Sequence, residues 1–235
     1  AREGAAYGAM VQPSLRRNAS GDVVFQSNGV PEVTSDPQVV GNFQPDWTGG
    51  LSTTLSYKGV TLSALIDGQM GGDVYSLSNK FGTYSGLLRS TVTNNQRQTG
   101  VIPEGVVVPS DAEPNDSGNY DVEGTDFGEA VGRIPAASYW KNWFSAGGGD
   151  QFIYDATYAK LQELALTYSL PQSWFNDFAL RRASVSVTGS NLMFLYKEAP
   201  NIDPSVTLGA GNIQGVESAQ IPPQRQFTFR VNLNF

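Results

Sequence analysis

The stretch from residue 224 to residue 235 limits the fold more than any other part of the chain. Its sequence, QRQFTFRVNLNF, carries an apolar side chain at every second position from Phe227 to Phe235, with polar side chains between them. Successive side chains of a β-strand point to opposite faces, so this is a strand with one apolar and one polar face. In a soluble sheet the apolar face of such a strand covers a core, and in an outer-membrane barrel it meets lipid.

Further stretches are also predicted to be strands, because their apolar residues alternate with polar ones. They are residues 47–57, 60–75, 152–170 and 180–196. The first two are separated by a tight turn and are predicted to form a hairpin with one polar face. In the third the alternation slips near Leu161, and we predict a β-bulge there, with a helix over residues 157–166 as the alternative.

The connections between these strands favour a membrane barrel over a soluble sheet. Two of them are short, at residues 58–59 and 171–179, and they alternate with long ones at residues 76–151 and 199–223. Outer-membrane barrels have short periplasmic turns and long external loops, and they carry aromatic girdles at both membrane interfaces. The aromatic residues near the predicted strand ends are Trp47, Tyr57, Tyr75, Tyr168, Trp174, Phe175, Tyr196 and Phe235.

We therefore predict an all-β fold of antiparallel strands with long extracellular loops. The predicted segments are an extracellular loop region (1–46), a barrel hairpin (47–75), a long extracellular loop (76–151) and the last three barrel strands with their connections (152–235).

Composition argues against several classes of function. The chain has no cysteine and no histidine, so it offers no disulfide framework and no Ser/His/Asp or Cys/His arrangement, and we expect no enzymatic activity. Residues 101–132 contain acidic side chains and no Lys or Arg, within a formal net charge of −7. Such a balance argues against nucleic-acid binding. No run of about 18 apolar residues predicts a transmembrane helix, and the first residues show no signal peptide.

Several segments carry motifs that occur together in one protein family. Residues 42–50 read NFQPDWTGG, and residues 65–75 read LIDGQMGGDVY. Residues 158–171 read YAKLQELALTYSLP, residues 187–192 read VTGSNL, and residues 222–225 read PPQR. These motifs, in this order, resemble the PDWxGG signature and the later strands of the SusC/RagA family of TonB-dependent outer-membrane transporters. The departures are small: an Ala stands in the third segment where the family usually has Arg, and Arg230 or a neighbour replaces a family Gly.

The resemblance implies that the chain is the C-terminal barrel portion of such a transporter, within a barrel of about 22 strands. It also implies the partners: the remainder of the barrel and its plug, a SusD-like surface lipoprotein, TonB acting through a missing N-terminal part, and membrane lipid. The location would be the outer membrane, and the cargo would be oligosaccharides or peptides. The alternative from a different class is a surface structural or glycan-binding adhesive β protein.

An aromatic cluster is the candidate substrate site. Tyr139, Trp140, Trp143 and Phe144 lie within a short stretch of the long predicted loop. They would form a platform on which a sugar or a peptide stacks, or they would pack beneath the loop or against a lid partner.

The acidic loop supplies the candidate metal ligands. Carboxylate oxygens suit Ca²⁺, and Asp111, Asp116 and Asp121 are the candidates. Their spacing does not match the EF-hand template, so a solvated acidic loop is the simpler interpretation, and apart from this Ca²⁺ we expect no cofactor.

Polar side chains on the predicted strands should line the barrel lumen, which stays polar because water and the plug occupy it. The residues predicted to face the lumen are Asp67, Gln69, Glu163, Arg230 and Asn232.

Overall fold

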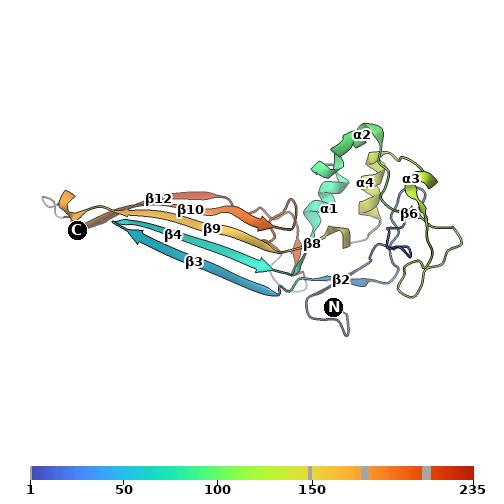
Figure 1. The fold of residues 1–235 in the computed structure, drawn as a ribbon, viewed down its shortest axis with the longest axis horizontal. Coiled ribbons are helices and arrows are strands. Elements are labelled where there is room, and N and C mark those ends of the chain that lie inside the picture. The colour runs from blue at the N-terminus through green and yellow to red at the C-terminus, as the bar shows by residue number, and fades with distance from the viewer. Residues whose placement is uncertain (1, 148–149, 176–179, 208–212) are drawn as a thin grey trace. The chain divides into compact units, whose positions relative to one another are not determined.

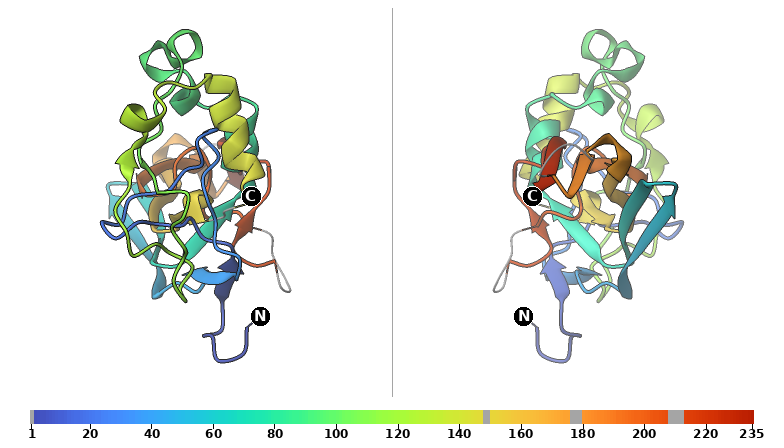
Figure 2. Two further views of the ribbon diagram at one scale, coloured as in Figure 1. Left: turned by 90° about the vertical axis from the view of Figure 1, so that its right-hand side faces the viewer. Right: turned by 90° about the vertical axis from the view of Figure 1, so that its left-hand side faces the viewer.

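The computed structural model describes residues 2–147, 150–175, 180–207 and 213–235. Its chain divides into two compact units, each built from separate stretches of sequence (Figures 1 and 2). The strand unit comprises Pro45–Gly71, Ala156–Ser205 and Ile221–Phe235. The loop unit comprises Ala1–Gln44, Gly72–Asp155 and Val206–Gln220. Residues 1–44 and 72–155 belong to the same unit.

The strand unit is a single open antiparallel sheet, which confirms the predicted antiparallel β architecture (Figure 1). Its strand order is β12-β10-β9-β4-β3. The strands are β3 (Trp47–Tyr57), β4 (Val60–Met70), β9 (Tyr158–Ser169), β10 (Arg182–Lys197) and β12 (Gln226–Asn234). None of the helices in the described part of the chain is long and apolar enough to cross a membrane.

The predicted hairpin forms, but its second strand ends earlier than expected. Lys58 and Gly59 have φ values of 45° and 84°, which suits the two-residue type I′ turn that follows the twist of the sheet. β4 stops at Met70 because Gly71 and Gly72 both take positive φ, 70° and 76°. The predicted strand 60–75 is thus β4 followed by a separate short strand of the loop unit.

The predicted bulge in the third strand is confirmed, and the alternative helix is wrong. Along β9, Glu163 pairs with Leu65 while Leu161 pairs with Ile66, so Gln162 is the extra residue. This insertion restores the alternation, because it returns the apolar side chains before and after it to the same face. The strand itself begins at Tyr158 rather than at residue 152.

The register gives the sheet one apolar face and one polar face across all five strands. The apolar face is exposed rather than covered: Phe229, Val231 and Leu233 expose 77%, 63% and 54% of their surface. Apolar side chains on this face include Trp47, Leu51, Leu55, Tyr57, Val60, Leu62, Ile66, Met70, Leu161, Leu164, Leu166, Tyr168, Val185, Val187, Phe227, Phe229, Val231 and Leu233. No second layer of the described chain seals these side chains, as a soluble sandwich would require.

The loop unit contains short strands and helices of its own. Its strands are β1 (Ala9–Gln12), β2 (Gln38–Asn42), β5 (Asp73–Ser76), β6 (Val106–Val107), β7 (Thr125–Asp126), β8 (Ile153–Asp155) and β11 (Val216–Glu217). Its α-helices are α1 (Leu77–Tyr84), α2 (Gln96–Thr99), α3 (Phe127–Ala130) and α4 (Ala136–Ser145). The helices α1 and α4 lie side by side in Figures 1 and 2.

The N-terminal segment supplies the core of this unit. Phe25 is almost fully buried, and its ring lies edge-on to Phe127 and to Trp143, with centroids 5.7 Å away in both cases. Ile134 and Tyr139 complete the cluster. Buried aromatic rings contribute strongly to the stability of a core, and through Phe25 the segments 1–44 and 72–155 share this one.

A buried carboxylate joins distant parts of the loop unit. Glu217 of β11 is 4% exposed and accepts hydrogen bonds from the Ser76 hydroxyl at 2.7 Å, from the Ser78 backbone N–H at 3.3 Å and from the Ala219 backbone N–H at 2.8 Å. Ser76 is the N-cap of α1, so the carboxylate also lies where the helix dipole favours negative charge.

We expect Glu217→Ala to destabilise the first turn of α1 by about 2 to 3 kcal/mol, because hydrogen bonds to a charged group are lost and buried donors are left without an acceptor. Native-state hydrogen exchange at the α1 amides of the full-length protein measures this change as faster exchange. Glu113→Gln is the matched control, since Glu113 is an exposed acid of the same unit. Equal exchange in wild type and Glu217→Ala would contradict the role of this carboxylate.

Candidate functional site

The residues predicted to face a lumen all lie on the polar face of the sheet. Asp67 and Gln69 pair across strands with Lys160 and Tyr158. The remaining residues pair with serines of β10: Glu163 with Ser190, Arg230 with Ser186 and Asn232 with Ser184. The five are spread over β4, β9 and β12, so they form a polar surface rather than a single binding cluster.

The aromatic residues at the ends of the apolar face match the height of a membrane. β3 runs from Trp47 to Tyr57, and at about 3.4 Å per residue and a tilt of about 40° these two residues are separated by about 26 Å along the membrane normal. The apolar band of outer-membrane barrels is about 25 Å tall. Tyr168 aligns with the Tyr57 end, and Tyr196 pairs with Ala159 near the Trp47 end.

A buried ion pair fixes the segment after β10 on the polar face. The Lys160 ammonium lies 3.1 Å from the Asp203 carboxylate, and their side chains are only 6% and 8% exposed. Lys197 donates to the backbone carbonyl of Ile202 at 2.7 Å. Both ammonium groups lie over the ring of Phe194, with the Nζ atoms of Lys160 and Lys197 at 5.1 Å and 5.3 Å from the ring centroid.

The same cluster extends to the predicted lumen residue Asp67. The Tyr158 hydroxyl donates to Asp67 at 3.3 Å, and the Tyr158 ring packs edge-on against Phe194 at 5.9 Å. Sequence reasoning missed Lys160 and Asp203. Lys160 falls on the polar face only because of the bulge at Gln162, and no alternation or motif marks a loop residue such as Asp203.

The predicted aromatic cluster lies on α4 and divides between core and surface. Tyr139 is buried, and Trp143 packs on it and on Phe25. Burial raises the pKa of the Tyr139 phenol, so this ring stays neutral and acts as a core residue. Phe144 turns to the other side of α4, where it contacts Tyr84 with ring centroids 4.7 Å apart.

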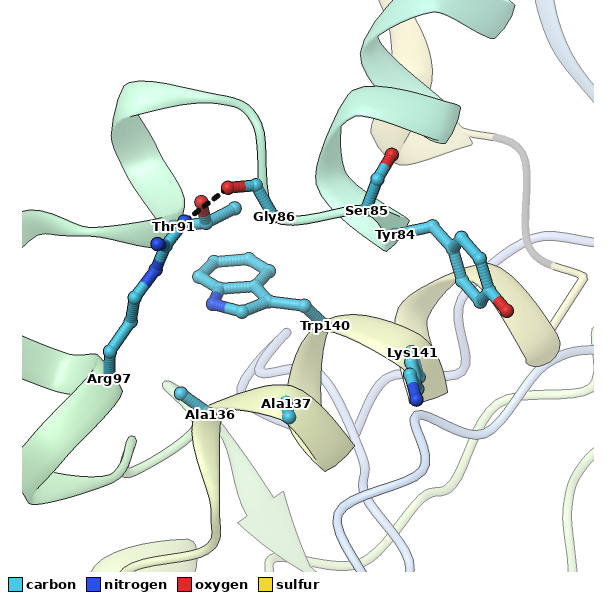
Figure 3. A pocket seen from close by; sticks show the side chains of 9 residues that line it. All are labelled: Tyr84, Ser85, Gly86, Thr91, Arg97, Ala136, Ala137, Trp140 and Lys141. Carbon is cyan, nitrogen blue, oxygen red and sulfur yellow. Dashed lines mark hydrogen bonds between the residues drawn. The ribbon is translucent and has the colours of Figure 1, made fainter.

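Tyr139, Trp140 and Trp143 all line a cavity, but only Trp140 of this cluster lines two. It lies between two cavities, of about 360 Å³ and about 720 Å³. In Figure 3 its indole lies in the smaller cavity, between Arg97 at one end and Tyr84 and Lys141 at the other. Arg97 is held there by a hydrogen bond from its Nη2 to the carbonyl of Gly86 (Figure 3).

The acidic loop does not gather the candidate Ca²⁺ ligands. Asp111, Asp116 and Asp121 are exposed, and Asp121 accepts a hydrogen bond from the Asn115 side chain at 2.7 Å. Within the described ranges, no group of three or more acidic side chains is placed to hold a metal ion. The positions of Asp111, Asp116 and Asp121 therefore do not support the predicted Ca²⁺ site.

No protein-family model matches the chain. Two curated relatives are TonB-dependent receptors P3 and P26 of Formosa agariphila. They are 23% identical over 224 residues and 25% identical over 207 residues, covering 92% and 86% of this chain. The chain spans about a fifth of their length, 19% and 18%.

Solved structures show the same fold at low sequence identity. The RagAB peptide importer in its closed-closed state matches with a TM-score of 0.55 at 17% identity, over 97% of this chain and 23% of that one. The RagAB peptide transporter matches with a TM-score of 0.54 at 18% identity, over the same shares. These matches include both the sheet and the loop unit, because nearly the whole chain is covered.

Proposed function

We propose that this chain, a fragment of a SusC/RagA-like TonB-dependent transporter, forms part of the barrel wall and the extracellular loops of an outer-membrane importer. The apolar face of the sheet would contact lipid, and the polar face would line the water-filled interior. The loop unit would stand at the extracellular end and meet the cargo.

The exposed apolar face is the observation that carries this proposal. Five strands in a row present apolar side chains on the same face, and the described chain supplies nothing to cover them. At about 25 cal/mol per Å² of apolar surface, leaving such a face in water would cost many kcal/mol. Lipid removes that cost, and the polar face opposite then needs water.

The two sheet edges support a larger barrel. β3 and β12 each pair with one neighbour only in the described part of the chain. An unpaired strand edge in hydrocarbon costs several kcal/mol for each unsatisfied backbone group, so membrane sheets close on themselves. We propose that further strands of the same protein complete the barrel, to a total of about 22 strands.

Connectivity supports our proposal for which end of the sheet is extracellular. The register places Trp47, Met70, Tyr158 and Lys197 at one end, and from this end the chain leaves towards segments of the loop unit. The opposite end carries the tight turn between Tyr57 and Val60. Short turns are periplasmic and long loops are extracellular in such barrels, so we place the loop unit outside the cell.

The partners and the cargo belong to the same proposal. A SusD-like lipoprotein would close over the loop unit, and TonB would act through a plug supplied by the rest of the polypeptide. Oligosaccharides or peptides would be the cargo, and the chain would carry out transport without chemical conversion. The RagAB structures to which this fold is similar are those of a peptide importer.

Single cysteines introduced into the full-length transporter test the orientation of the sheet, because this chain contains no cysteine of its own. Phe229→Cys places the thiol on the apolar face, and Thr228→Cys places it on the polar face of the same strand. In outer-membrane vesicles we expect a lipid-soluble maleimide to label Phe229→Cys strongly and a charged maleimide to label it poorly. Thr228→Cys should react with the charged reagent.

Labelling of both cysteines by the charged reagent at similar rates would overturn the proposal. The result would instead favour a surface adhesive protein whose sheet stands in water. Extraction of the protein without detergent would lead to the same conclusion.

A further inference from the structure

Charge is segregated within the loop unit. Residues 77–99 and 136–145, which contain α1, α2 and α4, carry basic side chains and no Asp or Glu. Residues 101–132 carry acidic side chains and no Lys or Arg. The helical part of the unit is therefore a local positive surface on an acidic protein. A surface of this kind attracts anions.

Two of these basic side chains line one cavity, at opposite ends of the Trp140 indole (Figure 3). Arg97 of α2 and Lys141 of α4 both line the cavity of about 360 Å³ between α1, α2 and α4 (Figure 3). In the described part of the chain the only Lys or Arg within 4.0 Å of a carboxylate is Lys160. Among the described residues Arg97 and Lys141 thus have no acidic partner, and the guanidinium of Arg97 makes its single described hydrogen bond to the Gly86 carbonyl.

The wall between these cations is aromatic. The indole of Trp140 lies in the cavity, which Tyr84, Ser85 and Thr91 also line (Figure 3). The hydroxyls of Ser85 and Thr91 donate to the backbone carbonyls of Phe81 and Leu88. The Trp140 Nε1 is buried and lacks a hydrogen-bond acceptor among the described residues.

These features suit a sugar better than a peptide. A flat aromatic surface accepts the C–H face of a sugar ring, and the two cations can bond to the acidic substituents of the sugar. Strand addition, one common mode of peptide binding, needs a strand edge, and this cavity is instead walled by α1, α2 and α4. Its volume lies within the roughly 300–1,000 Å³ of small-ligand pockets.

We propose that the cavity between α1, α2 and α4 binds an acidic segment of an oligosaccharide. The sugar ring lies against Trp140, and acidic groups at the two ends of the bound segment pair with Arg97 and with Lys141, one cation at each end of the indole. This inference rests on the proposed function, because it assumes that the loop unit meets cargo outside the cell. It narrows the cargo from oligosaccharides or peptides in general to anionic oligosaccharides.

Calorimetric titration of the full-length transporter in detergent tests the inference. The probes are oligogalacturonate, a sulfated galactose oligosaccharide, a neutral galactose oligosaccharide and oligoglutamate of similar length. We expect an acidic oligosaccharide to bind at least about tenfold more tightly than the neutral one, since a charge-assisted pair is worth about one factor of ten. The two acidic probes show whether the site prefers a carboxylate or a sulfate.

Matched variants locate the binding. Arg97→Gln and Lys141→Gln should each weaken binding of the acidic oligosaccharide about tenfold, with little effect on a neutral one. Arg89→Gln is the control, because it removes the same charge from the same basic stretch at a residue that does not line the cavity. Its effect should stay within about twofold. Unchanged hydrogen exchange in α4 would show that the variants remain folded.

Three results would overturn the inference. They are equal affinity for the neutral and acidic oligosaccharides, tighter binding of oligoglutamate than of either acidic sugar, and an equal loss of affinity in Arg89→Gln and Arg97→Gln. The cysteine labelling described above tests the membrane orientation without any ligand. Failure of the sugar site would leave that labelling unchanged, so the two proposals fail separately.

Discussion

Asp203→Ala is expected to destabilise the strand unit by about 3 to 5 kcal/mol, because it leaves a buried charge without compensation. The carboxylate of Asp203 is the only acidic partner of the Lys160 ammonium in the described structure, and both side chains are more than nine-tenths buried. Removal of Asp203 therefore leaves the Lys160 charge unpaired in a buried site. The measurement is the urea midpoint of the full-length transporter refolded in lipid vesicles, compared with wild type.

The double variant Lys160→Met with Asp203→Leu is the matched control. It removes both charges and keeps similar volume, so we expect stability within about 1 kcal/mol of wild type, or above it. A large loss of stability in the single variant and none in the double variant would show that the unpaired Lys160 charge causes the loss. It would also show that the Lys160–Asp203 ion pair itself adds little net stability. A single variant as stable as the double variant would contradict the burial of this ion pair.

The strands were predictable because their signal is local. Alternation from Phe227 to Phe235 needs no information from elsewhere in the chain, and membrane strands are long enough to show it clearly. Even the bulge was visible, since one inserted residue shifts the apolar positions from one parity to the other, as they shift near Leu161. The end of β4 was missed because Gly71 and Gly72 interrupt the strand without breaking the alternation on either side.

The loop unit was not predictable, because distant residues hold it together. Glu217 caps α1 from a position 141 residues away from Ser76, and Asp150 accepts a hydrogen bond from the Ser14 hydroxyl, 136 residues away. Its helices are short, with α2 and α3 containing four residues each. Isolated helices of this length are not stable in water, so tertiary packing decides their conformation.

The candidate aromatic site was predicted only in part. The sequence placed Tyr139, Trp140 and Trp143 in one stretch, but only Tyr139 is buried in the core, while Trp140 and Trp143 are partly buried and pack against it. The useful sequence signal was the absence of acidic residues around α1, α2 and α4. The sequence alone does not show that Arg97 and Lys141 line the same cavity, because only the fold brings α2 and α4 together.

Leu164→Arg is expected to destabilise the folded protein in lipid by about 2 to 4 kcal/mol, because an arginine near the middle of the lipid-facing band must leave its charge in hydrocarbon or distort the bilayer. Leu164 pairs with Ala64 and Gly189, between the aromatic residues at the two ends of the apolar face. The measurement is again the shift of the urea midpoint in lipid vesicles, with the amount of folded protein in the outer membrane as a second readout.

Two further arginine variants separate lipid from a protein core. Ala165→Arg lies next in β9 on the polar face, where a charge meets water, and its cost should be far smaller. Val60→Arg lies on the apolar face but aligns with Tyr57 and Tyr168 at the end of the sheet, so its cost should fall to about 0 to 1 kcal/mol. If protein covered the apolar face, the cost of an arginine would not fall from the middle of the strand towards its end. Equal costs at Leu164 and Val60 would therefore mean that protein, and not lipid, covers the apolar face.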